Sequence, residues 1–324
     1  MIALAAACCA VALLAPSLRA AQNEAASSYP SRPVRFIVPY APGAGTDTTA
    51  RTLAAKLSER WAQQVVVDNR AGGGGHIGIE YTAKANPDGY TIGMLTASHA
   101  TAAASMQKMG YDIVKDLQPI TQAISVFYVV YVPPSLPVKS IKELIAYAKA
   151  NPGKLNYGTS GTGSLQHFGG ELLSHMAGIR MVHVVYKGSA PIITAMLANE
   201  VHLGFNSMFS VRPQVHAGRL RWIAMTASRR SPSVDLPTVA ESGLPGYEVN
   251  QWYGVSTSAR VPAPIVEKLH AAITDVLQAP DVVQRLSADG SDIVGSTPAR
   301  FGEYVGSEIE KWRKLVKAAN LSLN

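Results

Sequence analysis

Two glycine-rich turns carry the residue types that could bind a small anion. The first reads PYAPGAGTD over residues 39–47, and the second reads YGTSGTGS over residues 157–164. Glycines let the backbone approach a ligand closely, and the free N–H groups and dipole of a following helix favour a negative charge. These turns therefore predict anion recognition through backbone N–H groups and small hydroxyls.

Neither turn matches a phosphate loop, and the catalytic motifs that we sought are missing. No Gly-Lys-Ser/Thr follows Gly45, which excludes a Walker A loop, and the third glycine of a dinucleotide fingerprint is absent from the first turn. The sequence has neither a Gly-X-Ser-X-Gly elbow nor a His-Glu-X-X-His zinc motif. The chain is therefore expected to bind rather than to catalyse, with no cofactor.

The histidines do not form a metal-binding pattern. His167, His175 and His183 recur every eight residues, but eight residues along a helix are about 80° out of phase, and the third histidine falls on a predicted strand. We therefore expect no metal site. His76 and His167 each lie within or just after a glycine turn, where we expect hydrogen bonding or packing ahead of a role as general base.

Polar side chains at the predicted helix starts have two open interpretations. Thr46 or Asp47 is predicted to cap the first helix, because a side-chain oxygen there can accept from a free N–H group. A ligand contact is the second possible role of Asp47. Ser160 and Ser164 are likewise expected to cap a helix, and both hydroxyls could also face a bound anion.

Each turn is positioned by a predicted strand before it and a predicted helix after it. Residues 34–38 form a β-branched and aromatic run typical of a buried strand, and the apolar residues from Ala50 to Trp61 have the spacing of one helix face. The same order returns with a strand at 154–157 and a helix from Leu165 to Met176. Two copies about 115 residues apart predict two similar lobes that face each other.

The other elements fit a parallel α/β sheet in each lobe. Further strands are expected at the following ranges: 64–68, 90–95, 123–132, 181–185, 201–205, 220–226 and 253–255. Asn206 directly follows one of them, at a strand end, where ligands of open α/β sheets usually lie. Helices that begin near Pro264 and Thr297 are expected to pack on the first lobe.

The amino-terminal residues resemble a secretory signal peptide. Residues 1–15 are almost wholly apolar and small residues follow to Ala21, which is shorter than the run of about 20 apolar residues that a membrane span needs. Cys8 and Cys9, the only cysteines, lie inside this segment, and a lipoprotein anchor there is the alternative. The formal net charge of +7 is dispersed, so we expect no nucleic-acid partner.

Several motifs, taken together and in order, resemble the Bug family. These are PYAPGAGTD at 39–47, VDNRAGGGG at 67–75, NPDGY at 86–90, YGTSGTGS at 157–164, YKG at 186–188, and DLPT with ESG at 235–243. The Bug family comprises the extracytoplasmic solute receptors of tripartite tricarboxylate transporters. The resemblance covers essentially the whole chain after the leader.

The resemblance implies an α/β, two-lobe periplasmic-binding-protein-like fold (type II) that closes on a small carboxylate. We expect a signal peptide at 1–21, the first part of lobe 1 at 33–122, lobe 2 at 123–226, and a return to lobe 1 at 227–324. The implied partners are a small organic acid and the membrane subunits of a transporter, with the receptor a periplasmic monomer. Transport and ligand sensing for a signalling protein both remain open.

The resemblance places the ligand against loops at strand-to-helix junctions of both lobes. The expected ligand-binding residues are Ala41, Gly43, Thr46, Asp47, Gly74, His76, Ser98, Ser160, Gly163, Ser164 and Asn206. Asn206 departs from the family, in which the corresponding strand often ends in an aspartate. An asparagine lacks the charge that would pair with a ligand ammonium group, so a plain or hydroxylated acid is expected rather than an amino acid.

Two other functions remain as alternatives. One is an enzyme, a transferase or hydrolase, on a similar two-lobe scaffold, against which the missing catalytic motifs argue. The other is a phosphate or nucleotide binder, which ranks last because the expected pairing of a lysine with a hydroxyl is missing from the glycine turns.

Overall fold

The computed structural model describes residues 27–43, 45–105, 109–186, 188–231, 234–288 and 291–319. The predicted leader, with Cys8 and Cys9, and Lys187 of the YKG motif lie outside the described residues. None of the described helices is long and apolar enough to cross a membrane.

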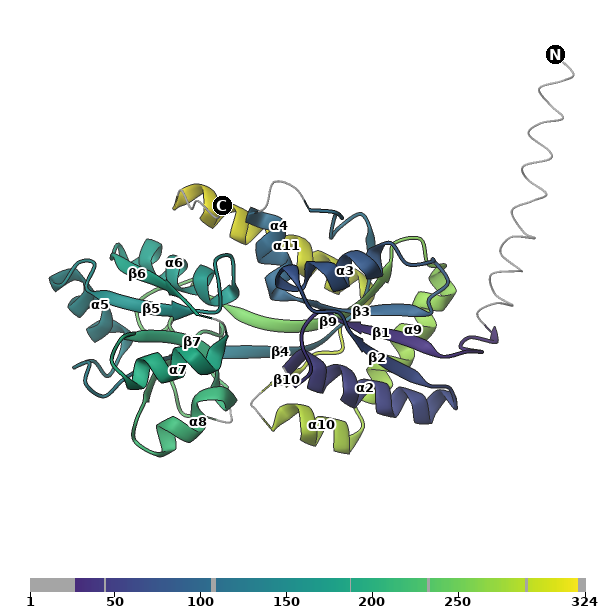
Figure 1. The fold of residues 1–324 in the computed structure, drawn as a ribbon, viewed down its shortest axis with the longest axis horizontal. Helices are drawn as coiled ribbons and strands as arrows, with labels where there is room; N and C mark the ends of the chain where they lie inside the picture. The colour runs from purple at the N-terminus through teal and green to yellow at the C-terminus, as the bar shows by residue number, and fades with distance from the viewer. Residues whose placement is uncertain are drawn as a thin grey trace, which may run out of the picture.

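The chain forms two lobes that lie side by side and are joined through the middle by the long strand β4 (Figure 1). The sheet of the first lobe has the order β2 (Val65–Asn69), β1 (Val34–Val38), β3 (Thr91–Thr96), β9 (Asn250–Ser258) and β4 (Leu117–Val132). β1 pairs in parallel with β2 and β3, and β9 is antiparallel to both β3 and β4. The short strand β10 (Asp292–Ile293) pairs with the free side of β4.

The second lobe repeats the parallel arrangement on the far half of β4. β5 (Leu155–Thr159) lies between β6 (Met181–Val185) and β7 (Leu203–Ser207), parallel to both. β7 and β8 (Arg221–Met225) flank the end of β4 and are antiparallel to it. β4 thus belongs to both sheets, and its partner changes from β9 at Phe127 to β7 at Tyr128. The proposed division at 122 and 123 falls inside this strand, shortly before that change.

Helices cover both sheets, and several begin at the carboxyl ends of parallel strands. In the first lobe these are α2 (Gly45–Trp61), the short 3₁₀ turn η1 (Gly73–Gly75) with α3 (His76–Ala83), α4 (Ala97–Ser105), α9 (Ala263–Leu277), α10 (Pro280–Ser287) and α11 (Pro298–Ala318). In the second lobe they are α5 (Ile141–Ala150), α6 (Leu165–Ala177), α7 (Ser189–Leu197) and α8 (Met208–His216). The strand ends and helix starts of the two lobes therefore face the space between them (Figure 1).

The apolar stripes predicted from the sequence form the cores. Leu53 and Leu57 of α2 pack with Ile273 of α9 in the core of the first lobe, and all three side chains are fully buried. Burial of a leucine side chain contributes about 2 kcal/mol, so this contact fixes α2 and the turn that precedes it. Phe168 of α6 and Trp312 of α11 contact each other edge to face, with ring centroids 5.2 Å apart. The last helix thus reaches the second lobe as well as the first.

The predicted strands are confirmed in type and place, but some bounds and helices differ. β4 begins at Leu117 instead of residue 123 because register irregularities beside Pro119 and Gln122 let a proline fit in the strand. β7 continues through Asn206 to Ser207, and β9 is longer than the three residues predicted. α4 was not predicted, since its sequence ASHATAAAS has little amphipathic periodicity, and it lies where only a ligand loop was expected.

Candidate functional site

Two pockets open between the lobes, and residues from both lobes line each of them. The first, which we call the histidine pocket, has a volume of about 640 Å³ and is lined by Tyr40, Gly73, Gly74, His76, Ser98, Ala102 and Ser105 of the first lobe and by residues 160–164 and Gly188 of the second. The second, which we call the arginine pocket, has a volume of about 560 Å³. Its lining includes Gly43, Thr48, Ser189, Asn206, Ser207 and Arg285.

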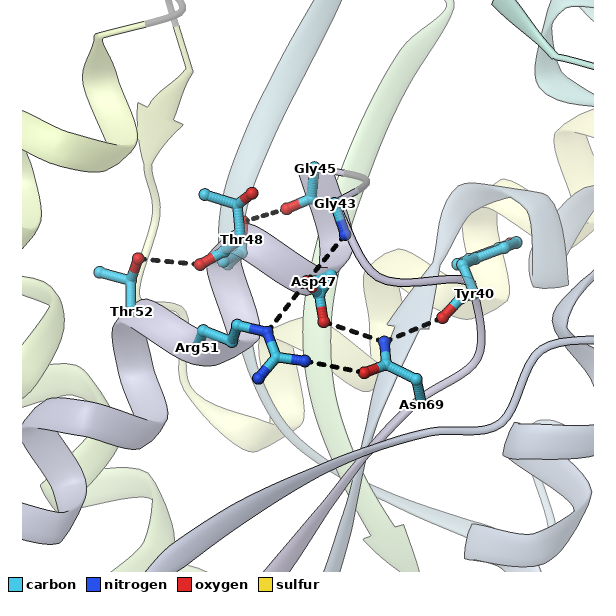
Figure 2. Close-up of polar contacts among 9 residues, drawn as sticks. Tyr40, Gly43, Gly45, Asp47, Thr48, Arg51, Thr52 and Asn69 are labelled. Atoms are coloured by element: carbon cyan, nitrogen blue, oxygen red, sulfur yellow. Dashed lines mark hydrogen bonds and ion pairs between the residues drawn. The ribbon is translucent and has the colours of Figure 1, made fainter.

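The first glycine turn is held by Asp47 (Figure 2). The Asp47 carboxylate accepts from the backbone N–H of Gly43 at 2.9 Å, from Arg51 Nε at 3.0 Å and from Asn69 Nδ2 at 2.9 Å. Arg51 also donates to Asn69 Oδ1, and Asn69 donates to the Tyr40 carbonyl, so the network joins the turn to the end of β2. Burial alone would raise the pKa of the Asp47 carboxyl, but these hydrogen bonds hold it below its usual value.

The predicted N-cap at Thr46 or Asp47 is therefore wrong. α2 begins at Gly45, so both residues lie inside its first turn, and the Asp47 carboxylate binds the preceding turn rather than a helix N–H. Thr46 Oγ1 is buried without a hydrogen-bond partner among the described residues. Neither side chain lines a cleft pocket, and the exposed Ala41 does not line one either. Asp47 thus stabilises the glycine turn, and its carboxylate already accepts hydrogen bonds from Gly43, Arg51 and Asn69.

His76 lies at the start of α3 with its ring between aromatic neighbours. Its Nδ1 is 2.9 Å from the Tyr111 hydroxyl, and its ring meets that of His99 edge to face, with centroids 5.7 Å apart. Burial lowers the pKa of His76, and it lowers that of His99 to about 3, so both imidazoles are neutral at pH 7. A neutral imidazole that contacts a tyrosine hydroxyl suits the predicted hydrogen-bonding role of His76.

The second glycine turn is hydrogen-bonded to one of a pair of stacked histidines. Gly163 N donates to His167 Nδ1 at 3.2 Å, and the rings of His167 and His183 stack with centroids 3.9 Å apart. Burial lowers the pKa of each histidine to about 4, which leaves Nδ1 of His167 free to accept this hydrogen bond at neutral pH. Thr101 of α4 donates to the Gly163 carbonyl at 3.1 Å, a direct contact between the lobes at this turn.

The serines of this turn support its shape. Ser164 is the N-cap of α6, since its Oγ accepts from His167 N at 3.3 Å, as predicted. Ser160 does not cap the helix: its hydroxyl donates to Gln166 Oε1 at 2.8 Å, because the helix begins five residues further along at Leu165. Both serines nevertheless line the histidine pocket.

Asn206 lines the arginine pocket from β7. Its side chain is buried, its Oδ1 accepts from Ser207 N at 2.9 Å, and its Nδ2 makes no well-formed hydrogen bond among the described residues, with the buried Tyr131 hydroxyl as its neighbouring acceptor. A buried amide N–H₂ without an acceptor is costly unless a ligand or water supplies one. Asn206 therefore lines the cleft at the strand end where the sequence predicted a ligand contact.

The structure brings most of the predicted site residues into the cleft. Gly74, His76, Ser98, Ser160, Gly163 and Ser164 line the histidine pocket, and Gly43 and Asn206 line the arginine pocket. The sequence reasoning missed Tyr40, Ser189 and Arg285. Tyr40 lies in a quoted motif and Ser189 directly follows another, so both could have been found, whereas Arg285 lies on α10, a helix that the sequence analysis did not predict.

The cleft carries hydroxyl and amide groups and no acidic side chain among the described lining residues of either pocket. Among the described lining residues, the basic side chains are those of Arg285 in the arginine pocket and His76 in the histidine pocket. No group of three or more His, Cys, Asp or Glu residues that could hold a metal ion occurs in the described ranges. Such a lining can attract and hold an anion through N–H and O–H donors.

Comparison with known proteins places this arrangement in context. A family model described as "Tripartite tricarboxylate transporter family receptor" matches residues 49–321. Protein BugT of Bordetella pertussis is 35% identical over 304 residues, with 92% of each chain covered. A solved structure from R. palustris, described as containing adipate, has a TM-score of 0.81 and 37% identity, covering 91% of this chain and 99% of that one. The periplasmic binding protein BugD has a TM-score of 0.78 and 32% identity, covering 91% and 99% of the two chains.

Proposed function

The chain belongs to the tripartite tricarboxylate transporter family of receptors, and we propose that it binds a small organic carboxylate between its lobes and delivers it to the membrane subunits of such a transporter. The observation that carries this proposal is the lining of the cleft. Glycine turns, hydroxyls and one buried amide line the cleft from both lobes, with no carboxylate among the described lining residues.

The chemistry of the lining suits a carboxylate better than a phosphate. No lysine stands among the described lining residues of either pocket, and Ser98, Ser160 and Ser164 contribute hydroxyls. A carboxylate has two oxygens that accept from such neutral donors, and the helix starts at α2 and α7 add a favourable field. The solved relative with adipate, itself a carboxylate, supports the same ligand class.

The same family membership supports a proposal for the cell location and the partners. We propose that the protein is exported, that residues 1–21 are removed, and that the mature receptor is a periplasmic monomer. Its dispersed positive charge would help to attract an anionic solute. The alternative in which the ligand-bound receptor acts on a signalling protein uses the same cleft.

We further propose that the protein does not transform its ligand. The neutral histidines His76 and His167 contact tyrosine and backbone groups and are not paired with a serine nucleophile within the described residues. Incubation with an acid that binds, followed by recovery and mass spectrometry of that acid, distinguishes a receptor from an enzyme. Quantitative recovery of the unchanged acid is expected, and stoichiometric or catalytic conversion would contradict the proposal.

The ligand class is tested by isothermal titration calorimetry of the mature protein. We expect saturable one-to-one binding of at least one acid from a panel of C4 to C6 mono- and dicarboxylates, with phosphate and a nucleotide as negative controls. Binding of phosphate or nucleotide with no carboxylate binding would overturn the proposal.

A further inference from the structure

Gly163 is held by hydrogen bonds from both lobes. Its N–H donates to Nδ1 of His167 on α6 at 3.2 Å, and its carbonyl accepts from the hydroxyl of Thr101 on α4 at 3.1 Å. Gly163 lines the histidine pocket with a left-handed φ of 77°. The backbone geometry at this one residue therefore affects both the shape of the pocket wall and a contact between the lobes.

Other N–H groups of the same turn also donate within it. Gly161 N donates to Thr159 Oγ1 at 3.3 Å, and Ser164 N donates to the Gly161 carbonyl at 3.2 Å. Thr159 Oγ1 in turn lies 2.5 Å from Nε2 of His183. Both stacked histidines thus contact the turn, His183 through a threonine hydroxyl and His167 directly. These hydrogen bonds fix the shape of the turn, because glycine itself restricts the backbone very little.

The hydrogen bond from Gly163 determines which nitrogen of His167 carries the proton. A ring nitrogen that accepts from an N–H group must be unprotonated, so neutral His167 carries its proton on Nε2. A second proton on His167 can therefore enter only at Nδ1, the atom that binds Gly163. His167 itself is 6% exposed and does not line either cleft pocket, so it acts on a ligand only through the turn.

Three titratable groups face His167 in the described part of the chain. Glu171 Oε1, on the same helix, is 4.0 Å from His167 Nε2, and the Glu171 carboxylate accepts from the Tyr157 hydroxyl on β5 at 2.5 Å. The Tyr157 ring stacks on that of His167 with centroids 6.5 Å apart. His183 on β6 stacks at 3.9 Å, which disfavours a charge on both imidazoles. The glutamate is the one anion among the three, and it stands on the Nε2 side of the ring, away from Gly163.

We propose that His167 is a positioning residue for ligand binding: its neutral imidazole sets the second glycine turn in the shape that receives the ligand, through the hydrogen bond from Gly163 N to Nδ1. The inference rests on the proposed function, in which an acid binds in the cleft against this turn. A proton on Nδ1 would place two N–H donors against each other, so the protonated ring cannot hold Gly163. The turn would then lose one of the hydrogen bonds that fix it, and its contact with Thr101 would weaken as well.

Two variants separate the acceptor atom from the bulk of the ring. Oδ1 of an asparagine lies as many bonds from Cβ as Nδ1 of a histidine does, so His167→Asn keeps an acceptor for Gly163 N, whereas His167→Leu does not. In calorimetric titrations of the mature protein with succinate and adipate at pH 7, His167→Leu should weaken binding about tenfold. His167→Asn should stay within about threefold of the wild-type affinity. His175→Leu changes an exposed histidine of α6 outside both pockets and is the control that should leave affinity unchanged.

Nuclear magnetic resonance tests the contact without a ligand. At pH 7 the ring nitrogen shifts of wild-type His167 should show an unprotonated Nδ1. Burial lowers the pKa of His167 to about 4, so in a titration from neutral pH towards that value the Gly163 amide resonance should shift together with the His167 ring. In His167→Asn the same amide resonance should stay nearly constant, although His183 still titrates there.

The outcomes separate this inference from the proposed function. If either acid binds and His167→Leu keeps the wild-type affinity, the positioning role is refuted and the receptor function stands. Equal losses in His167→Leu and His167→Asn would also refute it, since the ring and not its acceptor atom would then matter. A protonated Nδ1 at pH 7, or a Gly163 amide that ignores the titration of His167, refutes it without any ligand. If the wild-type protein binds neither acid, the proposed ligand class is overturned for these acids, and the resonance titration still decides whether His167 holds the turn.

Discussion

The carboxylate of Asp47 accepts a hydrogen bond from the backbone N–H of Gly43 at 2.9 Å, so the first turn of α2 holds the loop that precedes it. Gly43 lines the arginine pocket with a left-handed φ of 88°, a conformation that glycine adopts without strain. The shape of this glycine turn therefore depends on a buried charge that does not itself line either cleft pocket.

Asp47→Ala should destabilise the protein by about 2–4 kcal/mol. The variant leaves the N–H groups of Gly43 and Asn69 and the Arg51 guanidinium without their acceptor in a partly buried place, and hydrogen bonds to charged groups are the costly ones to lose. The measurement is urea unfolding at pH 7. Carboxylate affinity should also fall, because the turn at Gly43 loses its anchor.

Asp235→Ala is the matched control, since that carboxylate is fully exposed and contacts Arg230 only at 3.6 Å. We expect it to change stability by less than about 0.5 kcal/mol. If the two variants change the free energy of unfolding equally, the hydrogen-bond network around Asp47 does not stabilise the protein more than an exposed ion pair does.

Gly163→Ala should weaken ligand binding beyond its effect on folding. Gly163 has a φ of 77°, and an added Cβ would meet no atom within 4 Å, so the cost to folding is backbone strain of about 1 kcal/mol. The Cβ would stand in the turn that lines the histidine pocket and hinder an anion there. The measurements are thermal unfolding and calorimetric titration with a bound carboxylate.

Gly153 offers a matched control for this variant. Its φ of 73° and empty surroundings are nearly the same, but it lies in the loop before β5 and lines neither cleft pocket. Gly153→Ala should lower the unfolding midpoint to a similar extent and leave affinity unchanged. Unaltered affinity of Gly163→Ala would argue that the second turn does not touch the ligand.

The fold could be predicted from the sequence because its signals are local. Alternating strands and amphipathic stripes, such as that from Ala50 to Trp61, predicted the strand–turn–helix units, and their repetition predicted two lobes. The length of β4 could not be predicted, since Pro119 interrupts its apolar pattern and only pairing with β9 accommodates the proline. α4 was missed because its small residues are buried by tertiary contacts, which periodicity does not reveal.

The candidate site could be predicted where the glycine turns form its lining, and could not be predicted where a side chain distant in the sequence contributes. Gly43, Gly163 and the nearby serines follow from the glycine turns themselves. The histidine pair that holds the second turn could not be predicted in this way. The stacking of His167 on His183 joins α6 to β6, and no spacing rule relates those two positions. Arg285 comes to the cleft only because α10 returns to the first lobe late in the chain.

The protein should lose stability in mild acid through its buried histidines. Burial lowers the pKa of His167 and of His183 to about 4, whereas a histidine in an unfolded chain titrates near about 6.5. The unfolded state therefore binds more protons in this window, so the full stability is present above about pH 6.5 and falls as the pH is lowered to about 4. Thermal unfolding across pH 4 to 8 checks this expectation.

His183→Gln should flatten that profile, because it removes one of the titrating groups. His175→Gln changes an exposed histidine on the same helix as His167 and is expected to keep the wild-type profile. If the stabilities of the two variants have the same pH dependence, the stacked histidine pair is not the cause of the loss of stability in acid.

Ligand binding should bring the lobes together. β4 and the chain that enters β9 connect the lobes, and the cleft between them holds both pockets. Small-angle X-ray scattering of the mature protein should give a smaller radius of gyration at saturation with a carboxylate than without it. An unchanged radius at saturation, with binding verified by calorimetry on the same sample, would argue against closure about these strands.

Asn206 should make the receptor favour an acid without an ammonium group. The buried amide of Asn206 lines the arginine pocket with its Oδ1 occupied, so its Nδ2 suits a carboxylate or hydroxyl oxygen and would oppose a buried ammonium. In a calorimetric comparison of succinate with aspartate, the wild-type protein should bind succinate more tightly. Asn206→Asp should weaken succinate binding about tenfold or more, because a second negative charge would stand near the ligand carboxylate. Asn206→Ser retains a neutral hydroxyl donor at the same strand position and should weaken succinate binding less.

Tight binding of aspartate with no binding of succinate by the wild-type protein would overturn this assignment. The pocket would then have to supply an acceptor for the ammonium group, and the Asn206 amide does not offer one because its Oδ1 is already bound to Ser207 N.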